Sequence, residues 1–198
     1  MRPKYIFCFV CICISRLMNI LFGVYIQLWV MSFQKQGVIE TKEESDATYR
    51  NIVLVIQLCV VLTIPIFGYL SDKVDLRVVI PFAFASRGIV AASFKSIDNP
   101  NDWDAYVLCV LLVITSVVQF LSVEVMFIRN MRSTIRGTMT GIAFFFGSVG
   151  TTTFVMVGGI LFDKVGPWAP FMLVGATDGV IIIFIMIYLG LGLIKRDD

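Results

Sequence analysis

The sequence predicts an all-α integral membrane protein with six transmembrane helices, folded as one domain over residues 1–198. Hydrophobic residues make up 58% of the chain, charged residues only 15%, and histidine is absent. An average soluble domain is about half apolar and about a quarter charged. Here the apolar residues are gathered into long runs, and a helix needs about 20 such residues to cross a bilayer. We therefore expect a lipid bilayer around this chain.

The first apolar run, at about 5–33, is longer than a straight span requires, so its helix must tilt or project from the bilayer. The start, Met1-Arg2-Pro3-Lys4 before apolar residues, also resembles a signal peptide. The run is too long for a signal core, however, and no small-residue cleavage site interrupts it cleanly. We therefore expect a retained first helix.

Polar loops separate the later runs. The loop at 34–50 is acidic, and the loop at 95–104 combines acids with turn formers. A basic loop follows the fourth run, and a short turn at 163–167 separates the last two. Pro65 lies near the end of the second run, where a kink is tolerated in a membrane bundle. The remaining helices are expected at about 51–70, 78–94, 105–128, 138–162 and 168–194.

The distribution of basic residues predicts that both termini face the cytoplasm. Six spans put both ends on one side, which then carries nine lysines and arginines against five on the other. Cytoplasmic loops are enriched in lysine and arginine. The nine are Arg2, Lys4, Lys73, Arg77, Arg129, Arg132, Arg136, Lys195 and Arg196. Trp29, Trp103 and Trp168 then all fall at the opposite interface, where amphipathic rings are favoured.

A tight charged turn joins the second and third runs. It reads Gly68-Tyr69-Leu70-Ser71-Asp72-Lys73-Val74-Asp75-Leu76-Arg77. Gly68 would let two helices approach closely, and Asp72 would accept hydrogen bonds from the start of the next helix. Lys73 and Arg77 would hold the turn on the cytoplasmic side.

This stretch resembles the signature loop of the major facilitator superfamily of secondary transporters. The residues that match the family's pattern are Gly68, Leu70, Ser71, Asp72, Lys73 and Arg77. Asp75 stands where a glycine is usual, and Leu76 where a base is usual. The resemblance implies a gating or structural role for the loop.

Later segments extend the resemblance to nearly the whole chain, as one six-helix half of the family's fold. The pair Arg136-Gly137 opens the fifth run as an arginine-glycine pair does in these transporters, and glycines follow along the helix as packing positions. They are Gly147, Gly150, Gly158 and Gly159. Many members carry a glutamate and a proline close before the pair, whereas here Glu124 lies well upstream and the proline is absent.

The first run favours the C-terminal half of the family's fold. Ser15-Arg16-Leu17 and Leu28-Trp29 resemble the seventh helix of a full transporter more than its first. No long central linker follows the last run, as it would after a first half. The chain would then be a separate half-polypeptide or a product of a longer gene.

Four charged residues fall within or near the apolar runs: Arg16, Arg87, Glu124 and Asp178. A charge at the bilayer centre costs about 2.5–3.5 kcal/mol on insertion scales, so these groups should be paired or face a water-filled cavity. In the family the first, second, fourth and fifth helices of each half line the cavity. The resemblance therefore implies four candidates for substrate binding or coupling, which are Arg16, Gln57, Gln119 and Glu124.

Other roles stay open for the same charges. Arg87 and Asp178 are expected to pair as a clamp between the supporting third and sixth helices, and proton coupling is an alternative for Asp178. Arg16 is otherwise part of a structural ion pair. Glu124 lies near the cytoplasmic end, which favours the signature loop, Arg129 or Arg132 as its partner.

The sequence carries no signs of other chemistry. Cys8, Cys11 and Cys13 would fan out over different faces of one helix, so they are expected to be buried or lipid-facing thiols and not metal ligands. The bases are scattered among loops, which argues against nucleic-acid binding. Neither a nucleophile elbow nor a phosphate-binding loop is present. We expect no enzyme activity, cofactor or metal.

Two functions follow. The first is half of a secondary active transporter that moves a small solute by alternating access and needs a second six-helix half. If Arg16 lines the cavity, the solute is expected to carry an anionic group. The alternative is a transporter-derived accessory subunit of a larger membrane complex that no longer transports.

Overall fold

The computed structural model describes residues 3–71, 73–130 and 136–190, and this part of the chain consists of helices joined by short loops, with six helices long and apolar enough to span a membrane. The predicted all-α membrane fold is confirmed. The first span comprises α1 (Pro3–Ser15), α2 (Leu17–Ile20), a π-helical turn (Leu21–Tyr25) and α3 (Ile26–Lys35). The other spans are α4 (Lys42–Ser71), α5 (Leu76–Ser93), α6 (Trp103–Asn130), α7 (Arg136–Lys164) and α8 (Ala169–Gly190).

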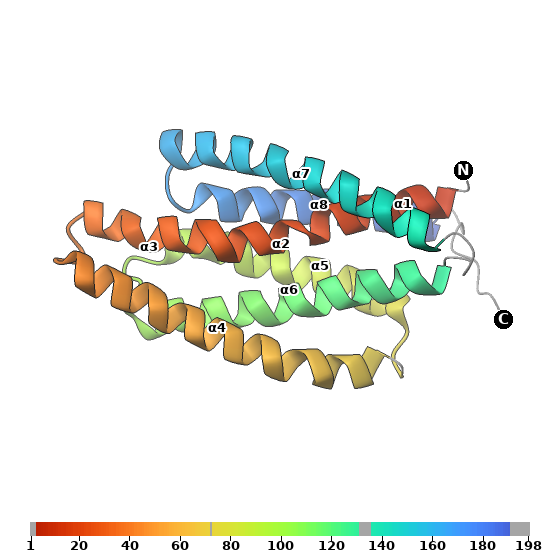
Figure 1. Cartoon of the computed structure of the whole chain (residues 1–198), viewed down its shortest axis with the longest axis horizontal. Coiled ribbons are helices and arrows are strands. Elements are labelled where there is room, and N and C mark those ends of the chain that lie inside the picture. Colours follow the sequence, from red (N-terminus) through yellow and green to blue (C-terminus); the bar gives the residue numbers. More distant parts are fainter. Residues whose placement is uncertain (1–2, 72, 131–135, 191–198) are drawn as a thin grey trace.

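The helices form two layers, as Figure 1 shows. The first span, α6, α4 and α7 make the front layer, with α4 and α7 at its opposite edges, while α5 and α8 lie behind. Helix α5 packs along α8 and α6, α4 packs along α6, and α7 packs against α1. The start of α1 and the end of α8 lie at the same end of the bundle. Which end faces the cytoplasm stays a prediction from the charges.

Helix α4 begins at Lys42, well before the apolar run at about 51 that marked its expected start. Thr41 caps it, because its hydroxyl accepts a hydrogen bond from the Glu44 backbone N–H at 3.2 Å. Glu43 and Glu44 stand in the first turn, where the helix dipole favours negative charge. Hydropathy predicts only the apolar part of α4, whereas the cap at Thr41 determines the residue at which the helix starts.

The first span is irregular around Arg16. Helix α1 ends at Ser15, whose hydroxyl donates to the Ile12 carbonyl at 2.9 Å, and α2 begins at Leu17. The π-helical turn then adds a residue to one turn, which shifts the faces of the helix. Tyr25, at the end of this turn, donates its hydroxyl to the Val155 carbonyl of α7 at 3.1 Å. The irregular span is therefore fastened to α7.

An aromatic cluster fills the core near the end of the bundle away from the start of α1. Trp29 is only 1% exposed and meets Phe33, Phe94 and Phe171 edge-on. The rings of Phe94 and Phe171 are stacked at 4.3 Å between centroids. The interfacial role expected for Trp29 is therefore wrong, because its ring packs inside the protein. Trp103, at 79% exposure, has the accessibility that such a role requires.

Three of the glycines on α7 face the first span. A Cβ at Gly147 would lie 3.2 Å from Arg16, one at Gly150 would lie 3.9 Å from Cys13, and one at Gly158 would lie 2.4 Å from the Tyr25 hydroxyl. These glycines let two helices come close. Gly137 and Gly159 differ, because a Cβ there would meet no atom within 4 Å among the described residues.

The same is true of Gly68 in the signature loop, where the expected close helix approach is absent from the described part of the chain. Close approach instead occurs at Gly88 and Gly175, where α5 crosses α8. A Cβ on Gly175 would lie 3.0 Å from the Gly88 carbonyl oxygen. The sequence analysis did not identify Gly88 as a packing position, although a glycine next to the charged residue Arg87 in an apolar run could have indicated one.

The adjacent glycines of α7 offer a matched test of the contact with Tyr25. We predict that Gly158→Ala lowers the free energy of unfolding by roughly 1–3 kcal/mol, the usual cost of overpacking a tight contact. Gly159→Ala should be neutral or slightly stabilising, because the new methyl group meets open space and alanine favours the helix. Thermal unfolding in detergent checks both variants. Equal effects of the two substitutions would contradict the packing described here.

Candidate functional site

Arg16 and Glu124 form an ion pair inside the membrane-length part of the bundle. The Arg16 Nη2 donates to Glu124 Oε1 at 2.5 Å. Arg16 occupies the break between α1 and α2, and Glu124 lies on α6. Both side chains are only partly covered, with 19% of Arg16 and 25% of Glu124 exposed. The structure thus joins two of the four candidates for substrate binding or coupling.

Aromatic rings and a glycine position the Arg16 guanidinium. Its Cζ lies 5.2 Å from the centre of the Phe120 ring on α6 and 4.3 Å from that of Phe144 on α7. Both distances lie in the range of cation–π attraction. Gly147 leaves room for the aliphatic part of Arg16 to lie against α7. The Nε is buried and has no hydrogen-bond partner among the described residues.

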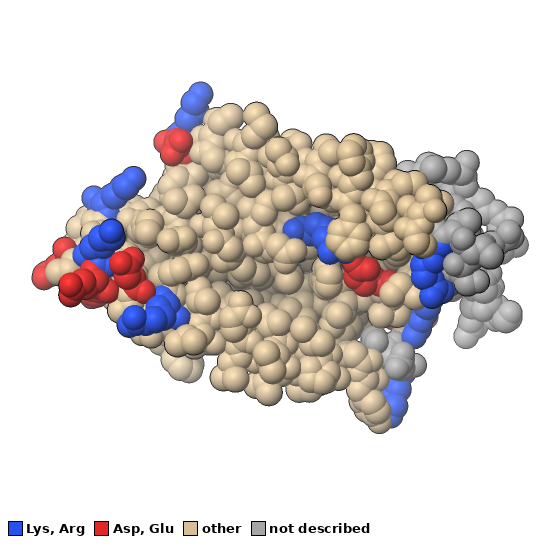
Figure 2. Space-filling view, viewed as in Figure 1, with Lys and Arg blue, Asp and Glu red and all other residues tan. Residues whose placement is uncertain are grey.

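The pair lies on a surface that is otherwise apolar at this level. Figure 2 shows charged side chains gathered at the two ends of the molecule, with a broad tan belt between them. Basic and acidic atoms also emerge within this belt. A charged group facing lipid is expensive, so this part of the front layer requires a covering of protein or water.

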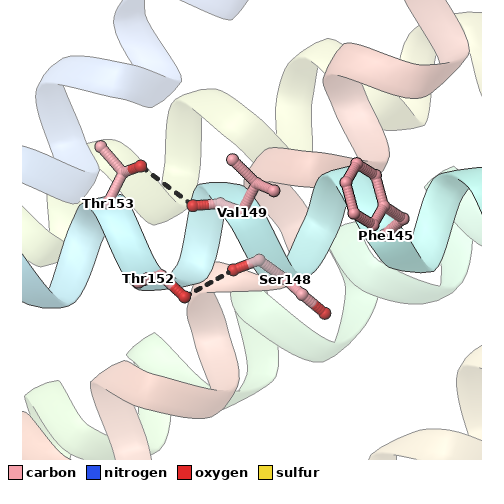
Figure 3. A pocket seen from close by; sticks show the side chains of 5 residues that line it. All are labelled: Phe145, Ser148, Val149, Thr152 and Thr153. Atoms are coloured by element: carbon pink, nitrogen blue, oxygen red, sulfur yellow. Dashed lines mark hydrogen bonds between the residues drawn. The ribbon is translucent and has the colours of Figure 1, made fainter.

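A shallow hollow on the exposed side of α7 carries a row of hydroxyl groups. Figure 3 shows its lining residues, which are Phe145, Ser148, Val149, Thr152 and Thr153. The Ser148 hydroxyl donates to the Phe144 carbonyl at 3.0 Å, that of Thr152 to Ser148 at 3.0 Å and that of Thr153 to Val149 at 2.9 Å. With their hydrogens committed to the helix, these groups offer outward-facing acceptor oxygens. The sequence analysis did not identify this row of hydroxyl groups, although the consecutive residues Thr151, Thr152 and Thr153 indicate a hydroxyl-rich part of the helix.

Arg87 and Asp178 form a second ion pair, which is fully buried at 1% and 0% exposure of their side chains. The Arg87 Nε donates to Asp178 Oδ2 at 2.7 Å, and Nη2 donates to Oδ1, so the contact is bidentate. It joins α5 to α8 beside the close approach of Gly88 and Gly175. The two parallel hydrogen bonds between the Arg87 guanidinium and the Asp178 carboxylate, with both charges buried, fit a clamp between the two rear helices.

The remaining two candidates lie elsewhere. Gln57 is exposed on α4. Gln119 is fully buried on α6, and its amide lies close to the Asp178 carboxylate without forming a hydrogen bond of good geometry. Gln119 therefore belongs with the rear ion pair and does not line the open face.

The signature loop is described only in part. Asp72 and the side chain of Arg77 lie outside the described residues. Leu70 and Lys73 are exposed, and the Lys73 ammonium lies 4.3 Å from the centre of the Tyr69 ring. At the start of α7, Arg136 donates to the Ile128 carbonyl of α6 at 3.5 Å.

Glu124 binds a different residue from those expected. The signature loop, Arg129 and Arg132 were its expected partners, and Arg132 lies outside the described residues. The contact seen is with Arg16, because the break after α1 brings the guanidinium to α6. In residues 3–71, 73–130 and 136–190, no three acidic or cysteine side chains come together as metal ligands would.

Comparison with known proteins gives one family. A family model described as Major Facilitator Superfamily matches residues 8–197. The chain is similar to the magnetosome protein MamH of Paramagnetospirillum magneticum strain AMB-1, at 26% identity over 178 residues, 88% of this chain and 39% of that protein. It is also similar to the magnetosome protein MamZ of Magnetospirillum gryphiswaldense strain MSR-1, at 24% identity over 157 residues, 79% of this chain and 24% of that protein.

The chain therefore spans less than half the length of these relatives. No solved structure matches the chain significantly.

The rear ion pair makes a prediction about stability. Asp178→Asn leaves the Arg87 charge buried without its counter-charge, and breaking such pairs typically costs about 3–5 kcal/mol. The double variant Arg87→Met with Asp178→Leu removes both charges and should recover most of the lost free energy of unfolding. Unfolding in detergent measures both. A double variant as unstable as Asp178→Asn would show that the pair is needed for more than mutual neutralisation.

Proposed function

The chain belongs to the major facilitator superfamily, and from this premise we propose that it forms one six-helix half of a secondary active transporter. Such a half moves a small solute by alternating access only together with a second half, because the central cavity lies between the two. We assign the chain to the C-terminal position. The Arg16–Glu124 pair on the open front layer is the observation that carries the proposal.

The cost of charge in a membrane supports a second half over this face. A pair that is 19% and 25% exposed within membrane-length helices must be covered by protein or water. A second half laid over the front layer would supply both, because it would enclose a polar cavity above Arg16 and Glu124. Helices α4 and α7 would flank this cavity and carry the contact.

The exposed sides of α4 and α7 suit that contact. They are the least buried of the described spans, with about one residue in six enclosed within the bundle. Their exposed residues are mostly apolar, including Leu54 and Val61 on α4 and Met156 and Ile160 on α7. Interlocking apolar side chains drive helix association in membranes through packing.

The guanidinium of Arg16 favours a solute with an anionic group. Only its Nη2 has a hydrogen-bond partner among the described residues, so further N–H donors remain in a planar fork. This fork matches carboxylate and phosphate groups. The hydroxyl row on α7 would add acceptors for donor groups elsewhere on the solute. Lys73 in the signature loop would act in gating, away from the solute, whereas Arg136 at the start of α7 would act in helix packing.

A specific observation also supports a non-transporting accessory subunit. The Arg16–Glu124 contact, together with Phe120 and Phe144, ties the first span to α6 and α7 as a structural pair would. In that case the pair would matter for assembly and not for uptake.

We predict that Arg16→Ala abolishes uptake while leaving membrane insertion and assembly intact. Loss of a charge-assisted hydrogen bond to the solute is worth about 1.5–3 kcal/mol, roughly a tenfold to hundredfold loss of binding. Uptake of labelled carboxylates and phosphate is measured in cells that make the chain with its second half. Arg50→Ala is the matched control, because Arg50 is exposed near the start of α4.

The outcomes separate the two functions. Undiminished uptake by Arg16→Ala would exclude Arg16 as a solute-binding residue. Loss of assembly in Arg16→Ala, restored when Glu124→Leu is added, would favour the accessory subunit. In that combination both charges are gone, so only a structural role for the pair predicts recovery.

A further inference from the structure

A second polar cluster lies behind the candidate site, on the side of α6 that meets the rear layer. It consists of Arg87 on α5, Ser116 and Gln119 on α6, and Asp178 on α8. Each of these residues is at most 1% exposed. Ser116 and Gln119 are three positions apart, so their side chains lie on the same side of the helix. The proposed solute site at Arg16 does not include this cluster.

The ion pair satisfies only part of the cluster. Arg87 donates twice to the Asp178 carboxylate. Gln119 approaches the same carboxylate from α6, and an amide in that position turns its N–H groups toward the negative charge. Within the described part of the chain, neither its Nε2 nor its Oε1 has a hydrogen-bond partner of good geometry.

Ser116 has the same deficit. Within the described residues its Oγ finds no hydrogen-bond partner. A serine in a helix ordinarily donates to a carbonyl one turn back, as Ser122 does to Val118 at 2.7 Å. The Leu112 carbonyl, which lies one turn before Ser116, instead accepts a hydrogen bond from Thr115 at 3.1 Å. The Ser116 hydroxyl is thereby left to interact with neighbouring helices.

Unsatisfied polar atoms are costly at this location. No bulk water is available in the hydrocarbon region, and a buried amide or hydroxyl without a hydrogen bond is strongly unfavourable. Most buried polar atoms in proteins therefore have a protein or water partner. Gln119 contributes two such atoms near the ion pair, and Ser116 contributes a third one turn away on the same side of α6, which indicates a shared missing partner.

We propose that a water molecule is bound among α5, α6 and α8 by Ser116, Gln119 and the Asp178 carboxylate. The chemistry of the cluster selects a small neutral ligand. Arg87 would repel a cation, and the paired carboxylate would repel an anion. The ligand must also donate to Gln119 Oε1 and accept from a donor such as Ser116, and water does both. Buried waters typically make about three hydrogen bonds.

The bound water would connect α6 to the clamp formed by α5 and α8. Helix α6 also carries Phe120 and Glu124, which hold Arg16 toward the front layer. Helix α6 would thus contact the bound water on its rear side and the candidate site on its front side. This inference does not depend on transport, because it concerns the stability of the three-helix contact.

Gln119→Met tests the proposal through the sign of its effect. Methionine has a similar length and no hydrogen-bonding amide. If water satisfies the amide, the substitution leaves the water and Asp178 with fewer hydrogen bonds, and the Tm falls. If no water is bound and the amide lacks hydrogen bonds, an apolar replacement removes the free-energy cost of burying it, and the Tm rises. Gln57→Met is the matched control, because Gln57 is exposed on α4 and its replacement should not shift the Tm.

Ser116→Ala provides a second variant that retains the helix. It should also lower the Tm, and the double variant with Gln119→Met should lose less than the sum of the single losses, because both residues bind the same water. High-resolution density for the intact protein should show a peak within hydrogen-bond distance of Ser116 Oγ and Gln119 Oε1. An unchanged or raised Tm in Gln119→Met, additive losses, or density without that peak would overturn the proposal.

Discussion

Charge within the hydrocarbon layer is the constraint on which this structure depends. Arg16, Glu124, Arg87 and Asp178 lie within the membrane-length helices and form two ion pairs. Each pair joins helices that are far apart in the sequence: Arg87 and Asp178 join α5 to α8, while Arg16 and Glu124 join the first span to α6. Since an unpaired charge at this depth costs several kcal/mol, these contacts help to specify which helices pack together.

The two ion pairs differ in their surroundings, and the difference suggests a structural role for the rear pair and a solute-facing role for the front pair. The rear pair is enclosed, bidentate and set beside glycines that bring α5 and α8 close. The front pair is partly exposed and is joined by a single hydrogen bond, with aromatic rings nearby. An enclosed pair in the rear layer, behind a front layer with accessible charge, would suit the alternating access that we propose for this half. Helix α6 contributes to both.

The sequence predicted most of the fold, because span length and hydropathy follow directly from bilayer thickness. It also singled out Arg16, Arg87, Glu124 and Asp178, since charge in an apolar run stands out. Which charged residues pair with one another was harder to predict. The break at Arg16 and the π-helical turn that follows it alter which faces meet, and neither leaves a clear sequence signal. Gln119 is likewise buried near Asp178, because a resemblance that assigns whole helices to a cavity does not specify which face of α6 turns toward it.

The glycines illustrate the same limit. Gly147 and Gly158 contact the first span, whereas a Cβ added at Gly159 or Gly68 would meet no atom within 4 Å among the described residues. A glycine-rich helix predicts close packing somewhere along its length, but the contacting face depends on the neighbour's side chains. Tyr25 selects Gly158 because the π-helical turn directs its ring to that point of α7. Trp29 was misplaced for a similar reason, since the Phe94–Phe171 stack offered it a partner inside the core.

The central claim is that this six-helix bundle works with a second one laid over its front layer. The most direct test is the mass and composition of the native particle extracted in mild detergent. The account predicts one further six-helix unit in that particle, either as a separate polypeptide or joined to this chain. A large assembly that contains this chain but no second six-helix half would contradict it, and the front ion pair would then be a contact for other subunits.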